Sequence, residues 1–257
     1  LAPLALVDAT SYALQLISCI DPLTTGPHHS LSLYVDGSTS DDRNEASWAV
    51  TIFHISGDNV WAYAGFQTGL VPTSGDHAQF LGADAPTSGA AELSAQVWAL
   101  SIALEHIMLH PIAKVYIRYD STYAASVAQA SSLPNVHVRL AAVASTLKTI
   151  LQSHVPLVFE HVRAHSDEPW NEMTDVVATT AFDAPSICTD RIPPACHWIR
   201  FTIENIRLLH LAFLPNTIAF AYPTLQDGHV LIANTNDGHW NALPADLIAN
   251  STFIIMH

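Results

Sequence analysis

The sequence predicts an α/β protein with a mixed five-stranded sheet flanked by helices over residues 31–182. Strand-like and helix-like segments follow each other in the order three strands, helix, strand, two helices, strand, helix. Hairpin strands followed by alternating helices and strands are typical of a mixed sheet with helices packed on it. Apolar residues make up 49% of the chain, which is enough to build a sizeable core.

The first three strands are expected at 31–36, 46–55 and 59–66. In the first, apolar residues alternate as they do in a half-buried strand. The other two are rich in β-branched and aromatic residues and are bounded by Gly, Asn or Asp, which predicts a meander. A polar loop containing Gly and Pro follows at about 67–87.

The next element is a long helix at 88–110, because apolar residues recur at helical spacing from Leu93 to Ile107. Pro111 ends this helix. The segment 114–119 is a strand that leads directly to an aspartate.

Two helices, a strand and a last helix complete the predicted fold. Ser121 and Thr122 can cap a short helix that runs to about Ala130. The remaining elements are a helix at 136–153, a strand at 155–162 and a helix at 169–182 with Pro169 in its first turn.

The two ends of the chain differ from this pattern. We interpret residues 1–30 as a linker or the tail of a preceding domain, and residues 183–257 as a C-terminal extension of unknown role. The chain begins with Leu1, so we expect it to be a piece of a longer polypeptide. No basic residue precedes the apolar start, as a signal peptide requires, and the apolar stretch 208–222 is short and interrupted. We therefore expect no membrane partner.

The charge balance argues against unaided nucleic-acid binding. Acidic residues outnumber basic ones 23 to 9, for a net charge of −14, whereas neutralising phosphates normally supplies much of the affinity. The 3 cysteines are an odd number, which excludes a full disulfide framework. We expect free thiols and an intracellular, reducing location, with nucleus and cytoplasm not distinguished.

Four carboxylates occupy related places in the predicted fold. Asp36 and Asp120 end two strands, Glu92 lies in the first turn of the long helix, and Asp175 lies inside the last helix. Carboxylates that converge repel one another unless cations neutralise them. Hard divalent ions with oxygen ligands do so, and two such ions roughly 4 Å apart can hydrolyse a phosphodiester.

The local sequences around these carboxylates resemble those of the ribonuclease H family. The matching segments are YVDGS (34–38), AAELSAQVWAL (90–100), IRYDSTYA (117–124) and HVRAHSDEPWNEMTDVVA (161–178). The resemblance covers residues 31–182 and is greatest to the ribonuclease H domains of retrotransposon polyproteins. It implies a ribonuclease H-like fold and an endonuclease that cleaves the RNA strand of RNA–DNA hybrids.

The resemblance also implies roles for individual residues. Two Mg²⁺ ions, or Mn²⁺ as a substitute, would be held by Asp36, Glu92, Asp120 and Asp175. His165 would lie in a mobile loop and assist water activation or product release. Substrate contacts are expected from Gly37, Ser38, Thr87, Ser88, Ser121 and Asn171. We also expect Asn171 and Glu172 to cap the last helix.

The sequence departs from the family pattern in its substrate-binding parts. Many members carry Asn and Arg just before the catalytic Glu, where this chain has the run 87–90, TSGA. The basic helical protrusion that some members use to hold DNA is not evident. A reverse transcriptase domain in the same polyprotein would then supply the phosphate contacts needed to bind the hybrid tightly.

Three alternatives remain. The first is a catalytically weak or inactive scaffold with this fold, which the net charge of −14 favours and the complete carboxylate set disfavours. The second is a phosphatase of the haloacid dehalogenase type, which needs a second Asp two residues from Asp36, where the chain has Tyr34 and Ser38. The third is an integrase or proofreading exonuclease, from which the DGS and HVRAHS segments point away.

Overall fold

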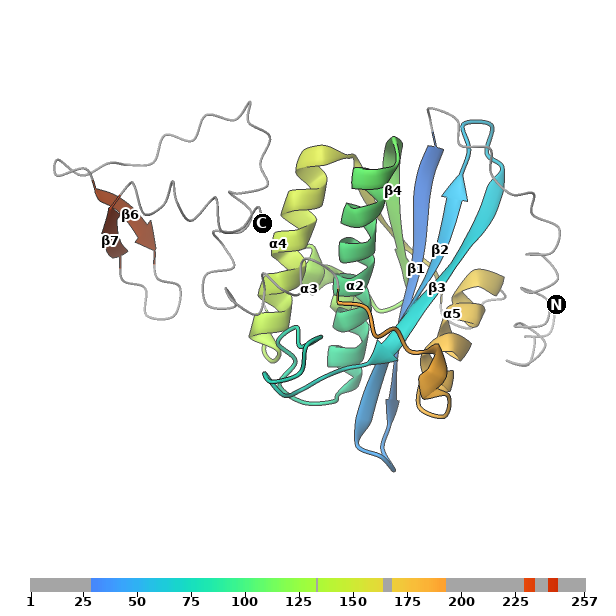
Figure 1. Ribbon diagram of the computed structural model, residues 1–257, viewed down its shortest axis with the longest axis horizontal. Coiled ribbons are helices and arrows are strands. Elements are labelled where there is room, and N and C mark those ends of the chain that lie inside the picture. The colour runs from blue at the N-terminus through green and yellow to red at the C-terminus, as the bar shows by residue number, and fades with distance from the viewer. Residues whose placement is uncertain (1–28, 133, 164–167, 193–228, 234–239, 245–257) are drawn as a thin grey trace.

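A computed structural model describes residues 29–132, 134–163, 168–192, 229–233 and 240–244 (Figure 1). The main elements are β1 (His29–Ser40), β2 (Glu45–Ile55), β3 (Trp61–Leu70), α2 (Ser88–Leu109), β4 (Ile112–Tyr119), α3 (Thr122–Ala128), α4 (Val138–His154), β5 (Leu157–His161), α5 (Pro169–Thr180) and the 3-10 turn η1 (Pro185–Ile187). Their order is the one predicted from the sequence.

The sheet has five strands in the order β3-β2-β1-β4-β5. β1 pairs with β2 in antiparallel fashion and with β4 in parallel fashion, and β4 pairs with β5 in parallel fashion. The predicted mixed sheet is therefore confirmed, with β1 at its centre.

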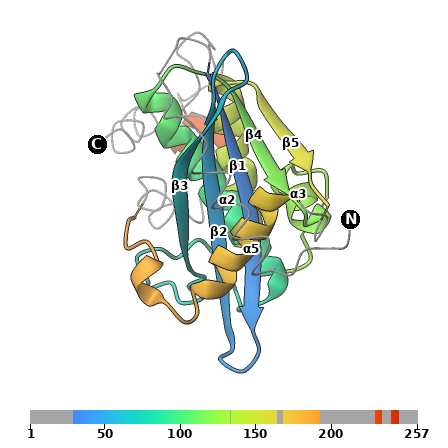
Figure 2. The ribbon, with the colours of Figure 1, turned by 90° about the vertical axis from the view of Figure 1, so that its right-hand side faces the viewer.

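Helices cover both faces of the sheet. α2 packs on β1, β2 and β4 and is backed by α3 and α4, while α5 lies across β1 and β2 on the other face (Figure 2). The main core lies between α2 and the sheet, where Trp48 of β2 stacks on Trp98 of α2 with ring centroids 4.1 Å apart. α2 is thus fixed along its length against the central strands.

Local chemistry sets the ends of α2. The Thr87 hydroxyl accepts a hydrogen bond from the Ala90 N–H at the N-terminus, as an N-cap residue does. At the other end His110 is extended and Pro111 follows, so the helix cannot continue.

Two strands are longer than the sequence predicts. β1 continues to Ser40 and β3 to Leu70, so the loop expected from residue 67 begins at residue 71. The extra residues pair with β2, as in Ser40↔Glu45 and Ser47↔Leu70. Pairing with a neighbouring strand overrides the weak strand preference of glycine and polar residues.

The segment after α5 stays attached to the sheet. The Thr189 N–H donates to the Thr68 carbonyl, and the Gln79 side chain donates to the carbonyls of Thr189 and Arg191. The predicted domain division at residue 182 remains a prediction. Farther on, β6 (His229–Ala233) and β7 (Trp240–Pro244) form an antiparallel pair. Among the described residues, no helix combines the length and apolar character of a membrane span.

Candidate active site

Two neighbouring strands bring the first pair of carboxylates together. The parallel pairing of β1 with β4 ends at Tyr34↔Arg118, so Asp36 and Asp120 both lie two residues beyond it. The prediction that Asp36 ends its strand is wrong, because β1 continues to Ser40 by pairing with β2 alone. Asp36 thus projects at the point where β1 and β4 separate.

A glycine sets the distance between β1 and α2. A Cβ atom added at Gly37 would lie 2.3 Å from the Glu92 backbone nitrogen, so only glycine permits this approach. Glu92 is the fifth residue of α2, in its second turn, rather than in the first turn as predicted. The close approach brings its carboxylate beside that of Asp36.

The carboxylates form one cluster. One oxygen from each of Asp36, Glu92 and Asp120 lies within 4.8 Å of the other two. Asp175 of α5 lies close enough to affect this cluster. Its charge, like that of Asp120, raises the pKa of both Asp36 and Glu92. The structure therefore brings Asp36, Glu92 and Asp120 together and places Asp175 near enough for its charge to act on two of them.

The carboxylates of this cluster repel one another. Asp36 is 5% exposed. Burial, and then the neighbouring charges of Glu92, Asp120 and Asp175, raise the pKa of Asp36 far above its ordinary value. Burial and the charges of Asp120 and Asp175 likewise raise the pKa of Glu92. Such a set of oxygen donors fits hard divalent cations, whose charge would relieve the repulsion.

Asn171 holds one of the ligands instead of capping α5. The N-cap residue of α5 is Glu168 and Pro169 begins the helix, so Asn171 is the third residue of α5. Asn171 thus lies in the first turn, is 2% exposed, and donates from Nδ2 to Asp120 Oδ2 at 3.3 Å. Its side chain binds Asp120 rather than the end of its own helix, whereas the predicted capping role of Glu172 stays a prediction.

The other predicted substrate residues lie on or next to elements that carry the carboxylates. Ser121 is the N-cap of α3 and follows Asp120 directly, and Ser38 Oγ lies 3.4 Å from Thr179 Oγ1. Thr87 and Ser88 are exposed at the start of α2. His165 lies outside the described residues, so its position remains a prediction.

Two positioning contacts were not foreseen from the sequence. The buried His137 accepts at Nδ1 from the Asp84 N–H, and its Nε2 lies 2.7 Å from Thr87 Oγ1, which fixes the exposed hydroxyl. Tyr34 donates its hydroxyl to Glu168 at 2.9 Å, at the start of α5. Neither contact has a local sequence signal, because the partners are 50 and 134 residues apart.

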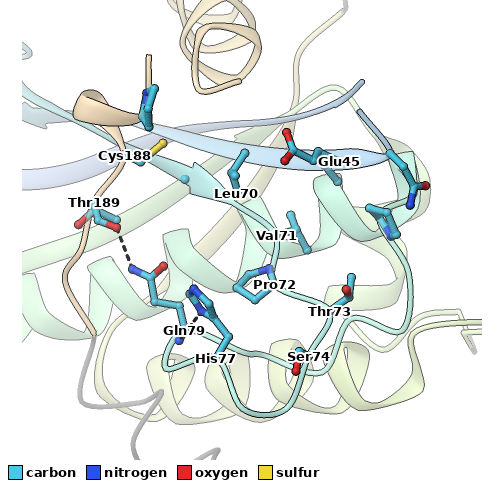
Figure 3. A pocket seen from close by; sticks show the side chains of 15 residues that line it. Glu45, Leu70, Val71, Pro72, Thr73, Ser74, His77, Gln79, Cys188 and Thr189 are labelled. Carbon is cyan, nitrogen blue, oxygen red and sulfur yellow. Dashed lines mark hydrogen bonds between the residues drawn. The ribbon is translucent and has the colours of Figure 1, made fainter. Parts of the chain in front are cut away.

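A pocket of about 500 Å³ lies elsewhere, between the end of β3, the following loop and the segment after α5 (Figure 3). Its labelled lining residues include Glu45, Leu70, His77, Gln79 and Cys188. None of the four carboxylates contributes to it. The chemistry-bearing group is therefore the acidic cluster rather than this pocket.

Several basic side chains of the domain are engaged within the protein. Arg43 donates to the Phe182 carbonyl and to Asp183, and Arg118 pairs with Glu160 at 3.0 Å. Lys148 donates to the Gln129 carbonyl at 3.1 Å. These contacts reduce the positive charge that is free for a phosphate backbone.

Comparisons with known proteins yield one family model and several similar solved structures. The family model described as RNase H matches residues 28–183, and no curated protein matches the chain. Similar solved structures include ribonuclease H1 from Halobacterium salinarum NRC-1, with 20% identity, a TM-score of 0.43, and coverage of 60% of this chain and 98% of that one. Another is the N-terminal ribonuclease H domain of a Mycobacterium tuberculosis protein, with 12% identity, a TM-score of 0.42, and coverage of 61% and 98%. The protease–reverse transcriptase of prototype foamy virus has 16% identity, a TM-score of 0.42, and coverage of 63% of this chain and 22% of that one.

Proposed function

The chain belongs to the ribonuclease H family, and we propose that it is an endonuclease that hydrolyses the RNA strand of RNA–DNA hybrids by two-metal-ion catalysis. The observation that carries the proposal is the convergence of the buried Asp36 with the half-buried Glu92 and Asp120, one oxygen of each lying within 4.8 Å of the others. Keeping repelling charges in a buried place costs stability, which a bound cation would restore.

The residues present fit divalent metal ions. Asp36, Glu92, Asp120 and Asp175 would hold two Mg²⁺ ions, with Mn²⁺ as a substitute. When bound, such ions activate a water molecule and stabilise the leaving oxygen of the phosphodiester. The chain's own residues hold the carboxylates in position and contact the substrate.

Those side chains orient the ligands. Asn171 donates to Asp120 and leaves the other carboxylate oxygen of that residue available. The absence of a side chain at Gly37 keeps Glu92 against β1. The backbone N–H of Gly37 donates to Asp36 Oδ1 at 2.9 Å, which fixes the rotamer of that carboxylate. Metal-dependent catalysis requires ligands that are held in position in this way before the ion binds.

Substrate contacts remain proposals for single residues. His165 would move a proton near the scissile phosphate, as a neutral imidazole can near pH 7. The exposed hydroxyls of Thr87 and Ser88 would meet the hybrid at the start of α2, and those of Ser38 and Ser121 would meet it beside the cluster. Gly37 would allow the substrate backbone to approach β1.

The setting of the domain is also part of the proposal. We infer that the domain comes from a retrotransposon polyprotein, in which an intracellular reverse transcriptase domain would be its partner. Such a partner would supply the phosphate contacts that a chain of net charge −14 lacks.

A second function is favoured by the engaged basic residues. If the domain does not hold the hybrid itself, it would serve as a catalytically weak or inactive scaffold. The two functions differ in one measurable property, which is metal-dependent cleavage.

The test is a cleavage assay on four labelled substrates. An RNA–DNA hybrid, double-stranded RNA, double-stranded DNA and single-stranded RNA of one sequence are incubated with the chain and Mg²⁺ or Mn²⁺. We expect cleavage of the hybrid's RNA strand alone, leaving 3′-hydroxyl and 5′-phosphate ends. No cleavage of the hybrid at micromolar chain with Mn²⁺ would support the scaffold instead.

A further inference from the structure

Four histidines gather at the other end of α2. β1 begins at His29, β2 ends one residue after His54, and α2 carries His106 in its last turn and His110 as its C-cap. Figure 1 shows these three ends at the same end of the sheet. The separations of ring centroids are 5.3 Å for 29–54 and 54–106, 5.9 Å for 54–110, 6.0 Å for 106–110 and 6.4 Å for 29–110.

The histidines continue the hydrophobic layer between the sheet and α2. His29 is two residues from the core residue Leu31 on β1, and His54 is paired directly opposite Leu31, so both side chains point to the face that α2 covers. His106 lies in the last turn of α2, and His110, the extended C-cap residue, follows it four residues later. Imidazoles therefore stand where the layer would otherwise be closed by apolar side chains.

Burial favours the neutral imidazoles of His54 and His106. His29 is 2% exposed, and His106 Nδ1 is buried with no hydrogen-bond partner in the part of the chain that the structure describes. Burial, and then the neighbouring histidines, lower the pKa of His54 to about 4, and burial has the same effect on His106. The neutral ring is the form that binds a metal ion.

Two of the ring separations are close to those around a tetrahedral ion. A Zn–N distance of about 2.0–2.1 Å places each ring centroid about 3.2 Å from the metal, so two centroids at the tetrahedral angle lie about 5.2 Å apart. The observed separations begin at 5.3 Å. Among the described residues, only the three carboxylates bring ligand atoms within 4.8 Å, so the imidazoles must turn about their side-chain bonds to converge.

We propose that His29, His54, His106 and His110 bind one zinc ion that ties the start of β1 and the end of β2 to the C-terminus of α2. Imidazole nitrogens select Zn²⁺ over Mg²⁺, which separates this site from the carboxylate cluster. The C-terminal end of the helix dipole favours a cation there. Four protein ligands close the coordination sphere, so the ion is structural. The charged groups beside the site are Arg191 and Glu105, which pair with each other.

Zinc binding to the full chain tests the proposal. The metal-stripped chain and the double variant H54Q/H106Q are titrated with Zn²⁺ alone against a chromophoric chelator. The matched control is His154→Gln, because His154 is also the last histidine of a helix, α4, but is exposed. We expect the double variant to lose one tight equivalent of zinc that the parent and the control retain, and its melting temperature to lose the zinc-dependent rise. Retention of that equivalent by H54Q/H106Q, or its absence from the parent, would overturn the proposal.

A second variant tests the proposal even if the double variant does not fold. His110→Gln alters a half-buried residue at the end of α2, and circular dichroism checks that it is folded. With Co²⁺ in place of Zn²⁺, the parent should show the intense visible bands of a four-coordinate nitrogen site. His110→Gln should weaken Co²⁺ binding by roughly tenfold or more. A weak six-coordinate spectrum in the parent, or unchanged affinity in folded His110→Gln, would contradict the site.

Discussion

The two ends of α2 carry opposite kinds of titratable cluster. Glu92, near the N-terminus, joins the carboxylates of β1, β4 and α5, whereas His106 and His110, about 20 Å along the helix, join histidines of β1 and β2. Burial acts on both clusters but in opposite directions. It raises the pKa of Asp36 and Glu92 and lowers the pKa of His54 and His106.

The difference shows which cluster needs a cation. Burial lowers the pKa of His54 and His106, so these two imidazoles add no positive charge to their cluster at neutral pH. Burial and neighbouring charges raise the pKa of Asp36 and Glu92, so a cation would be needed to hold both in the charged form at that pH. The cluster that contains Glu92 is therefore the one at which we expect a hard cation to be required for cleavage, and the four predictions below test this contrast.

The largest effect is expected for Asp120→Asn and Asp36→Asn. Each removes a charged metal ligand while keeping its shape, so hybrid cleavage should fall on the order of a thousandfold or more. The metal-free variants should unfold at the same or a higher denaturant concentration, because repulsion is relieved. Cleavage assays and denaturant unfolding with EDTA measure the two effects.

The matched control for both is Asp76→Asn, which changes an exposed aspartate in the loop after β3. It should cleave and unfold like the parent. If Asp120→Asn also cleaves like the parent, the carboxylate cluster is not the active site.

Gly37→Ala should have the next largest effect. The added methyl group would lie 2.3 Å from the Glu92 nitrogen and 2.4 Å from the Ala91 carbonyl carbon, so α2 must move away from β1. We expect a loss of about 1–3 kcal/mol in the free energy of unfolding, and lower activity because Glu92 is displaced. Gly75→Ala is the control, since nothing lies within 4 Å of its Cβ. Equal stability of the two variants would show that the close approach is not as described.

The pH dependence of stability separates the two clusters without a substrate. Carboxyl groups with a raised folded pKa stabilise the metal-free chain below about pH 4, and this contribution is lost as the pH rises. His54 and His106, whose folded pKa is about 4, act in the other direction, and their contribution is lost as the pH falls from about 6.5 toward 4. Each proton contributes a slope of at most about 1.4 kcal/mol per pH unit.

Denaturant unfolding in EDTA from pH 4 to 9 measures both the loss of stability at high pH and the loss at low pH. Asp36→Asn should flatten the loss of stability at high pH, and Mg²⁺ should do the same in the parent. His54→Gln should flatten the loss at low pH alone. An Asp36→Asn variant that changes stability only at low pH would contradict the assignment of the high-pH loss to the carboxylates and of the low-pH loss to the histidines.

The smallest effect concerns salt. Because Arg43, Arg118 and Lys148 are engaged within the protein, the isolated chain should bind hybrid weakly, with a salt dependence equivalent to roughly one to three neutralised phosphates. Affinity of the inactive Asp120→Asn variant across a range of NaCl concentrations measures it. Nanomolar binding near physiological salt, or a steep slope, would reveal a basic surface that the described contacts do not account for.

The sequence predicted the fold because its signals are local. Periodic apolar residues, the Ser121 cap and Pro111 placed every element of the sheet and its helices, with errors mainly at strand ends. Those errors arose where pairing with β2 extended β1 to Ser40 and β3 to Leu70, since pairing depends on a distant segment.

The sequence named the carboxylates of Asp36, Glu92 and Asp120, which the structure brings together, but not the residues that hold them in place. The signature segments identified Asp36, Glu92, Asp120 and Asp175 as one group. They did not reveal that Asn171 binds Asp120 or that His137 holds Thr87, because such contacts depend on tertiary geometry. The histidine cluster was hidden for the same reason, since its members come from three separate elements.

One measurement tests the central claim most directly: the single-turnover rate of RNA-strand cleavage in a hybrid, across Mg²⁺ concentrations, for the parent, Asp36→Asn and H54Q/H106Q side by side. We expect the parent and the folded histidine variant to show the same Mg²⁺-dependent cleavage, abolished by EDTA, and Asp36→Asn to lose it at every Mg²⁺ concentration. Cleavage that persists in EDTA, or an Asp36→Asn variant that matches the parent, would contradict the account.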